Sequence, residues 1–326
     1  MVKQGMNDTI IYLIHNCRFV RNIFRVFSPL KAKRLDLYDS FLKEYVYSYY
    51  PATSIEEKRF FNIGAGNQRS KFNIWTYIDL DTKHYSQSGI DINYDLESLK
   101  PLPLQDNSAE VIFSSFVIEH ISVDATKNLC TEAFRVLKKG GVYHIKVHCY
   151  DYSYKLFKRG LVTPKVPFEC RESDDLITDF LRKYKGKVKA YFDESNNYVV
   201  SSIKNPEDRI VFTPGLAFLY HNADAAVDNI CNMPEGADAV LNSIESDNPE
   251  QFYKIIRDKY IDQSKKQSYQ HNADYFSKEN LFKFIKNLGF TEVYFTQPYQ
   301  SVSPALWEDE LNNIHKGFVF SIEAIK

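Results

Sequence analysis

Glycine, acidic and hydroxyl residues follow short apolar runs in the first half of the sequence. The run at 60–63 breaks into the glycine-containing turn 64–67, and later runs lead to Asp79, Asp95 and Ser115. Glycine has no Cβ that would keep a ligand away from the backbone. A turn of this kind after a buried strand is typical of a cofactor site, and a carboxylate beside it can accept hydrogen bonds from the cofactor.

Strands that alternate with helices must position these residues. The sequence predicts short strands at 60–63, 75–79, 111–115 and 142–148, with a brief one starting at 92. It also predicts a helix at 124–138, because two lysines lie in the last turn and Gly140 and Gly141 follow. Such alternation favours a parallel sheet, which binds ligands beyond the carboxyl ends of its strands.

The connection between the first two strands is short. Only about eleven residues separate Asn67 from Asp79, which is near the lower limit for a parallel crossover. We therefore expect a loop or a very short helix there. A dinucleotide-binding turn is disfavoured because Arg69 stands where the third glycine of that motif would fall.

Five motifs in order resemble those of class I S-adenosylmethionine-dependent methyltransferases. They are Asn-Ile-Gly-Ala-Gly-Asn at 62–67, Tyr-Ile-Asp at 77–79, Tyr-Asp-Leu at 94–96, Ser-Ser-Phe-Val-Ile-Glu-His at 114–120 and Arg-Val-Leu-Lys-Lys-Gly-Gly at 135–141. The residues of these motifs are similar to those in a branch of small-molecule enzymes associated with glycan and polysaccharide modification. The resemblance covers residues 58–150 and returns at 277–326.

The resemblance implies S-adenosylmethionine (SAM) as the cofactor. A carboxylate can accept hydrogen bonds from both ribose hydroxyls, a role that falls to Asp79, while Asp95 would accept one from the adenine amino group. The full set of expected cofactor residues is Gly64, Ala65, Gly66, Asn67, Asp79, Leu80, Asp95, Leu96, Ser115 and Phe116.

The resemblance also implies the fold, which is an α/β Rossmann-like sheet of seven strands. Strands at 291–296 and 317–325 would close the sheet, with the last one antiparallel between the fifth and the sixth. Four regions result: an N-terminal helical extension at 1–54, a SAM-binding core at 55–150, a cap at 151–275, and the rest of the core at 276–326.

The cap is an insertion after the fifth strand, over the expected cofactor site. It has helix-like stretches at 173–184 and 249–263, so we expect a large helical cap. Long insertions at the mouth of a site commonly determine specificity and exclude water. Substrate choice is therefore expected to depend mainly on this region.

Methyl transfer needs a positioned acceptor and, for a hydroxyl acceptor, a general base. His148 is best placed because it ends the fifth strand, and Asp151 and His120 are the other catalytic candidates. His120 could equally orient the cofactor pocket. The expected substrate contacts are Tyr150, His221 and His271. Each of these residues could instead be structural.

The N-terminal segment is basic. Residues 10–34 contain six Lys or Arg and no acidic residue, and their apolar side chains share one helical face. Such a helix could cover the sheet, contact a membrane surface or an acidic substrate, or serve as a mitochondrial presequence. A second helix is expected at 35–50, followed by a linker at 51–54.

Composition disfavours several classes of protein. The net charge of −1 gives no general attraction to nucleic acid, and no stretch is apolar enough to span a membrane. Five scattered cysteines without a C-x-x-C pair favour neither a zinc site nor a disulfide scaffold and suggest the cytoplasm. His144 and His148 lie about 13 Å apart along a strand at roughly 3.3 Å per residue, too far to ligate one metal ion.

The sequence thus predicts a SAM-dependent methyltransferase, most simply an O-methyltransferase for a saccharide or glycan precursor. Two alternatives remain open. One is a non-catalytic SAM-fold protein whose insertion binds a partner. The other is a methyltransferase that residues 10–34 bring to a membrane-surface substrate.

Overall fold

We describe the protein from a computed structural model. The residues that it describes are 31–66, 68–81, 89–160, 188–192, 198–202, 209–212, 215, 218–219, 226, 229–230, 233–246, 248–261, 277–297, 299–308, 311 and 319–326. The basic segment at 10–30 and the predicted helix at 173–184 lie outside these residues.

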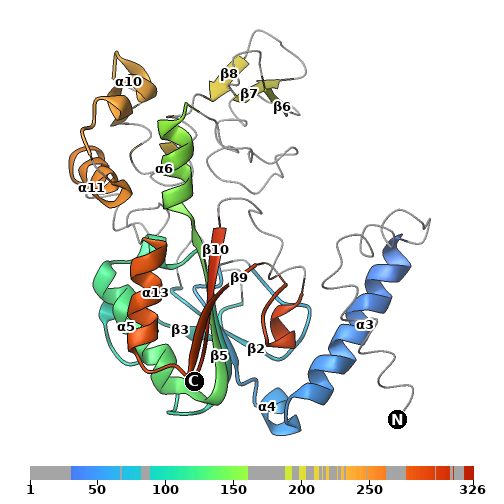
Figure 1. Ribbon diagram of the computed structural model, residues 1–326. Coiled ribbons are helices and arrows are strands. Elements are labelled where there is room, and N and C mark those ends of the chain that lie inside the picture. Colours follow the sequence, from blue (N-terminus) through green and yellow to red (C-terminus); the bar gives the residue numbers. More distant parts are fainter. Residues whose placement is uncertain are drawn as a thin grey trace.

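A seven-stranded sheet forms the centre of the molecule (Figure 1). Its strand order is β3-β2-β1-β4-β5-β10-β9, and β10 runs antiparallel to both of its neighbours. The predicted Rossmann-like sheet, with its last strand between the fifth and sixth, is confirmed. The strands are β1 Phe60–Ile63, β2 Trp75–Asp79, β3 Ile92–Asn93, β4 Ala109–Ser115, β5 Leu137–His148, β9 Glu292–Thr296 and β10 Val319–Ile325.

Helices cover both faces of the sheet. On one face, α5 (Val123–Val136) and α13 (Lys278–Asn287) bury their apolar stripes against alternate strand residues (Figure 1). On the other face lie α3 (Lys31–Tyr49), the short helix α4 (Ala52–Glu56) and the turn η4 (Pro304–Leu306). Alternation along the strands gives every central strand an apolar layer on each side.

The connection from β1 to β2 is a loop, as the short spacing predicted. No helix interrupts residues 64–74 in the part that the structure describes. Side chains satisfy backbone groups that a helix would have paired internally. Glu308 accepts hydrogen bonds from the hydroxyl of Ser70 and from the backbone N–H of Lys71, and Tyr77 Oη accepts one from the Ser70 N–H.

The predicted end of the central helix was wrong. Helix α5 ends at Val136, and strand β5 begins at once with Leu137 and includes both glycines. The pairing of β4 with β5 shifts between Ala109 and Val111, so residues 138–141 form a bulge whose Gly140 N–H donates to the Lys326 carbonyl. Glycine here bends a strand, and it does not stop a helix.

Two smaller expectations also need correction. Residues 52–54 of the predicted linker belong to α4, and Pro51 is the N-cap of that helix. The third strand is only two residues long, and the chain then turns into the 3₁₀ helix η1 (Leu96–Ser98), whose N-cap is Asp95. Asp95 therefore fixes a turn and does not end a strand.

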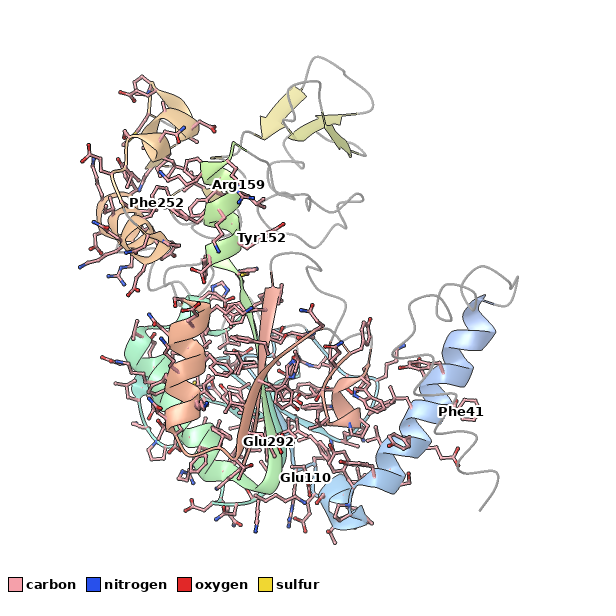
Figure 2. The ribbon with its side chains drawn as sticks, viewed as in Figure 1. Phe41, Glu110, Tyr152, Arg159, Phe252 and Glu292 are labelled. Carbon is pink, nitrogen blue, oxygen red and sulfur yellow. The ribbon has the colours of Figure 1, made fainter. Side chains whose placement is uncertain are left out.

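The insertion between β5 and α13 is mixed and not purely helical. It holds helices α6 (Tyr150–Lys158), α10 (Gly236–Asn242) and α11 (Pro249–Tyr260). It also holds an antiparallel sheet of β6 (Val188–Phe192), β7 (Tyr198–Ser202) and β8 (Arg209–Phe212), which the sequence did not predict. The insertion has an apolar core of its own, in which Phe252 of α11 is fully buried (Figure 2).

Contacts join this insertion to the sheet. Helix α6 continues almost directly from β5, and Figure 1 shows it rising beyond the end of that strand. The carboxylate of Asp151 accepts a hydrogen bond of 3.3 Å from the N–H of Lys278, at the start of α13. Among the described helices, none is both long and apolar enough to cross a membrane.

Candidate active site

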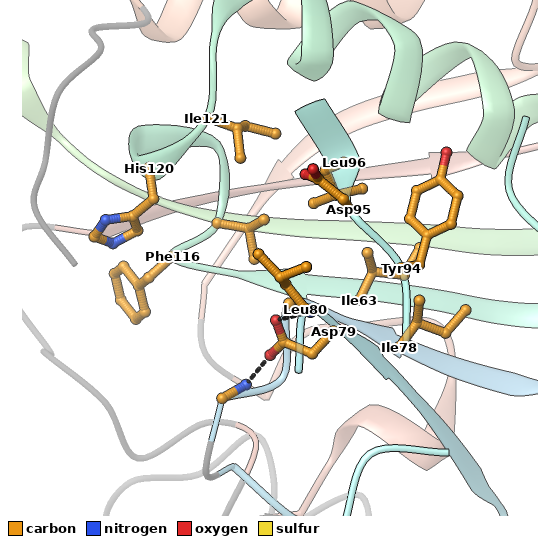
Figure 3. Close-up of a pocket in the computed structure, with 13 residues that line it drawn as sticks. Ile63, Ile78, Asp79, Leu80, Tyr94, Asp95, Leu96, Phe116, His120 and Ile121 are labelled. Carbon is orange, nitrogen blue, oxygen red and sulfur yellow. Dashed lines mark hydrogen bonds between the residues drawn. The ribbon is translucent and has the colours of Figure 1, made fainter. Parts of the chain in front are cut away.

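A pocket opens at the carboxyl ends of β1, β2 and β4. Figure 3 shows His120 and Phe116 at one end of it and Tyr94 with Ile78 at the other. The residues that line it are Ile63, Gly64, Gly66, Ile78, Asp79, Leu80, Tyr94, Asp95, Leu96, Phe116, Val117, His120 and Ile121. Seven of the ten predicted cofactor residues are among them, so the structure brings most of the predicted set together.

Asp79 joins the glycine turn to the end of β2. Its two carboxylate oxygens each accept one hydrogen bond of 2.7 Å, from the N–H of Gly66 and from the N–H of Leu80 (Figure 3). Partial burial raises the pKa of Asp79, although both hydrogen bonds and the nearby Arg69 oppose this effect. Each oxygen keeps a second lone pair, so the carboxylate can still accept hydrogen bonds from a ligand.

Gly64 is required by its conformation and by its neighbour. Its φ is +66°, a region that L residues rarely adopt, and its N–H donates to the Ile78 carbonyl at 2.8 Å. A Cβ at this position would lie 2.5 Å from a methyl carbon of Val117. The absence of a side chain thus lets the turn pass directly over the start of the segment that follows β4.

Asp95 and Leu96 form the wall above β3. The Asp95 carboxylate accepts a hydrogen bond of 2.9 Å from the Glu97 N–H and so starts the 3₁₀ turn. Glu97 in turn accepts hydrogen bonds from the N–H and the hydroxyl of Ser122, the N-cap of α5. This wall is therefore held to the first turn of the helix beside it.

Phe116 and His120 close the opposite end of the pocket. Phe116 has φ of +55°, which is unusual for a non-glycine residue, and its N–H donates to the Lys146 carbonyl at 3.0 Å. Strained backbone of this kind persists where the surrounding structure fixes it, and it concentrates at functional sites. The turn η2 (Ile118–His120) then returns the chain toward the pocket, where His120 lines it.

His148 lies behind Phe116. The two ring centroids are 4.6 Å apart. The buried carboxylate of Glu119 accepts a hydrogen bond of 2.9 Å from the His148 N–H and lies 3.5 Å from Nδ1 of its ring. Burial raises the pKa of Glu119 to about 7. An imidazole and a carboxylate, both able to exchange protons near neutral pH, thus lie next to the pocket.

The structure places the other predicted residues as follows. Ala65 and Ser115 are close to the pocket but do not line it. Tyr150 is buried in the insertion, between His148 and Tyr253, with ring centroids 6.3 and 5.5 Å away. Asp151 caps the start of α13 and is not at the pocket. Asn67, His221 and His271 lie outside the described residues.

Sequence reasoning missed five residues that line the pocket. They are Ile63, Ile78, Tyr94, Val117 and Ile121. Each lies next to a predicted site residue in the chain, and such strand-end neighbours could have been named. Apolar residues give no chemical signal, however, and only the fold shows which face of a strand or turn they present.

Among the described residues, no group of three potential ligands could hold a metal ion. His144, which shares a strand with His148, instead forms a buried contact of 2.8 Å with Glu323 of β10. Hydrogen bonds from Tyr294 and from the Val302 N–H complete the surroundings of Glu323. This group joins β5, β9 and β10 within the sheet.

Residues 71–145 match the family model for a methyltransferase domain. A search of the curated proteins found no match. Among solved structures, a SAM-dependent methyltransferase from Thermotoga maritima is 15% identical, with 97% of this chain and 98% of that chain covered and a TM-score of 0.34. Another, from Mesorhizobium loti, is 10% identical, with 87% and 96% covered and a TM-score of 0.36.

Both TM-scores are low, so the assignment depends on the family match, the strand order and the position of the pocket. Together these define the class of protein, an enzyme domain that uses SAM. The chain carries a class I SAM-dependent methyltransferase domain.

The pocket fits this cofactor. The turn at Gly64 and Gly66 leaves room for a ligand at the backbone, and Asp79 presents acceptor atoms at the end of β2, where the ribose hydroxyls are expected. Apolar side chains such as Leu96 and Ile121 suit the adenine ring. The individual contacts of these residues with SAM stay predictions.

Proposed function

We propose that the protein transfers the methyl group of SAM to a hydroxyl oxygen of a small polar acceptor, namely a saccharide or a glycan precursor. SAM supplies the methyl group on a positively charged sulfur. The chain's own residues must then place the acceptor oxygen in line with the methyl carbon and receive the hydroxyl proton.

The observation that carries this proposal is the position of His148. Its ring packs on Phe116, which lines the pocket, and His120 lies at the same end. A hydroxyl oxygen is a weak nucleophile while it keeps its proton. An O-methyltransferase therefore benefits from an imidazole at this place that can accept the proton. An amine acceptor can attack through its lone pair and has less need of such a base.

Aromatic rings next to the base support a saccharide as the acceptor. Phe116, His148 and Tyr150 follow one another with centroid distances of 4.6 and 6.3 Å. Phe116 lines the pocket, whereas Tyr150 is buried behind His148. A saccharide has apolar faces as well as hydroxyl groups, which suits an aromatic ring with an imidazole beside it. The similarity of the sequence motifs to enzymes of glycan modification points the same way.

The test is an acceptor screen with methyl-labelled SAM. Nucleotide sugars and oligosaccharides are compared with amines of similar size, and mass spectrometry with NMR locates the transferred methyl group. We expect methyl ethers of sugar hydroxyls. Transfer confined to amines would contradict the proposal.

A variant tests the assigned base. His148→Asn should lower kcat by about 10²–10⁴-fold while leaving SAM affinity unchanged. Tyr152→Phe is a suitable control, since Tyr152 is exposed on the nearby helix α6 (Figure 2). Equal loss of SAM affinity and kcat in His148→Asn would indicate a structural role for His148.

A further inference from the structure

The buried carboxylate of Glu119 has no assigned role. Its side chain is fully inaccessible to solvent. One oxygen, Oε1, accepts the His148 N–H and lies 3.5 Å from Nδ1 of the His148 ring. The other, Oε2, has no hydrogen-bond partner among the described residues.

A carboxylate at this position is unfavourable for stability alone. Removing an ionised group from water without full pairing is costly, and an apolar side chain of similar size would serve a structural core better. Burial accordingly raises the pKa of Glu119 to about 7. Its presence beside the site is therefore best explained by an effect on a neighbour.

That neighbour is His148. Three described groups lie beside its ring: Glu119 on η2, Phe116 on the preceding turn, and Tyr150 on α6. Lys146 shares its strand face, but the Lys146 ammonium points to the carbonyl of Leu311. Because Nδ1 faces Glu119, the other ring nitrogen, Nε2, lies on a different edge of the ring.

We propose that Glu119 is a positioning residue, which accepts Nδ1–H of His148 and thereby keeps Nε2 unprotonated as the base for the acceptor hydroxyl. This inference rests on the proposed function. In the reaction, the acceptor oxygen forms a bond to the methyl carbon while the carbon–sulfur bond breaks and its electron pair stays on sulfur. The hydroxyl proton moves to Nε2, and the resulting imidazolium is stabilised by the Glu119 carboxylate.

The first test uses the full chain with ¹⁵N-labelled histidine, in the presence of SAM, and needs no acceptor. NMR distinguishes the two neutral tautomers, and His148→Asn identifies the His148 signals. We expect neutral His148 to carry its proton on Nδ1. A proton on Nε2 would overturn the inference, since that nitrogen could not then act as the base.

The second test removes the charge of Glu119. We expect Glu119→Gln to lower the pKa of His148 by about one unit, because an acidic partner at this distance favours the charged imidazole. Glu110→Gln is the matched control, since Glu110 is also buried but lies at the opposite end of the sheet (Figure 2). Identical titration of His148 in folded Glu119→Gln and wild type would overturn the inference.

The proposed function and the proposed role of Glu119 can be refuted independently. If the acceptor proves to be an amine, the tautomer and the shift of the His148 pKa would still be observed. If hydroxyl transfer is found but neither NMR effect appears, Glu119 is structural. With a hydroxyl acceptor in hand, Glu119→Gln should lower kcat with little change in KM, which a merely structural role would not produce selectively.

Discussion

Asp79 has two tasks in the site. Its carboxylate holds the N–H of Gly66 and the N–H of Leu80, and it faces the pocket at the end of β2. The glycine turn and the acidic strand end are therefore one unit. A ligand that binds to the carboxylate also benefits from the geometry that the carboxylate imposes on the turn.

This unit predicts the effect of Asp79→Ala. Loss of hydrogen bonds to a charged group, about 1.5–3 kcal/mol each, should weaken SAM binding by roughly 10–100-fold or more. Calorimetric titration measures the change. Asp81→Ala is the control, since Asp81 is exposed two residues further along. Equal affinities for Asp79→Ala and wild type would refute the predicted cofactor role of Asp79.

Gly64 makes a prediction about stability and binding together. Gly64→Ala should destabilise the protein, because the left-handed conformation costs a non-glycine residue about 1–2 kcal/mol and the new methyl group would overlap Val117. Chemical denaturation and SAM titration measure both effects.

Val117→Ala provides the internal check on this prediction. The double variant should lose less unfolding free energy than the two single variants lose together. Without the Val117 methyl groups there is no overlap, and only the cost of the left-handed backbone at position 64 remains. Strict additivity would mean that Val117 does not restrict position 64.

At the scale of elements, the loop between β1 and β2 depends on a distant part of the chain. Glu308 accepts hydrogen bonds from Ser70 and Lys71 and is itself buried, while Arg69 packs over Tyr77 with its guanidinium carbon 4.3 Å from the ring centroid. These contacts replace the internal hydrogen bonds of the missing crossover helix. The glycine turn at one end of this loop is thereby held in place.

We therefore expect Glu308→Ala to weaken SAM binding severalfold, although Glu308 does not line the pocket. Two partly buried donors lose their acceptor, and each costs less than the about 1–3 kcal/mol of a fully buried group left unsatisfied. Calorimetry and denaturation provide the measurements. Glu57→Ala, which removes an exposed ion pair with Arg59, should change neither property noticeably. Destabilisation with unaltered SAM affinity would show that the loop keeps its shape without Glu308.

The strands of the sheet could be predicted because each is a short apolar run with a turn signal at its end. The place of Gly64 and Asp79 in the pocket lining could be predicted for the same reason, since they stand at the ends of β1 and β2. The start of β5 could not, because pairing with β4 and β10 overrides the local signal of Gly140. Long-range packing decides such boundaries.

The contact between Glu119 and His148 could not be predicted from the sequence either. The two residues are 29 positions apart, and they meet only because β4 and β5 are neighbours in the sheet and η2 folds back between them. The antiparallel sheet in the insertion was missed because β6, β7 and β8 are short and lie in a region with mixed signals. No motif marks either feature.

At the scale of the whole molecule, two buried ionisable groups affect stability in opposite pH ranges. Burial raises the pKa of Glu119 from 4.5 to about 7, so the folded state binds the extra proton between these values and stability falls as pH rises. Burial lowers the pKa of Lys146 from 10.5 to about 7, so the unfolded state binds the extra proton above pH 7 and stability rises with pH. These two groups alone give a minimum near pH 7.

The increase in stability above pH 7 can be tested with Lys146→Met. Wild-type stability should increase relative to the variant between pH 7 and about 10.5, with a slope of at most about 1.4 kcal/mol per pH unit. Denaturant unfolding across this range measures it. Lys139→Met, at an exposed position, should preserve the wild-type profile. Parallel curves for Lys146→Met and wild type would mean that Lys146 keeps its proton in the folded protein.

The contact between Glu308 and the β1–β2 loop also bears on synthesis. Glu308 follows Ser70 by 238 residues, and β10, which fills the gap between β5 and β9, comes later still. Domains form as translation proceeds, yet a ribosome-bound chain that has only reached the insertion lacks both parts. In such a nascent chain Asp79 can already hold Gly66, but the β1–β2 loop lacks its contact with Glu308, so the loop is fully held only after translation has passed Glu308.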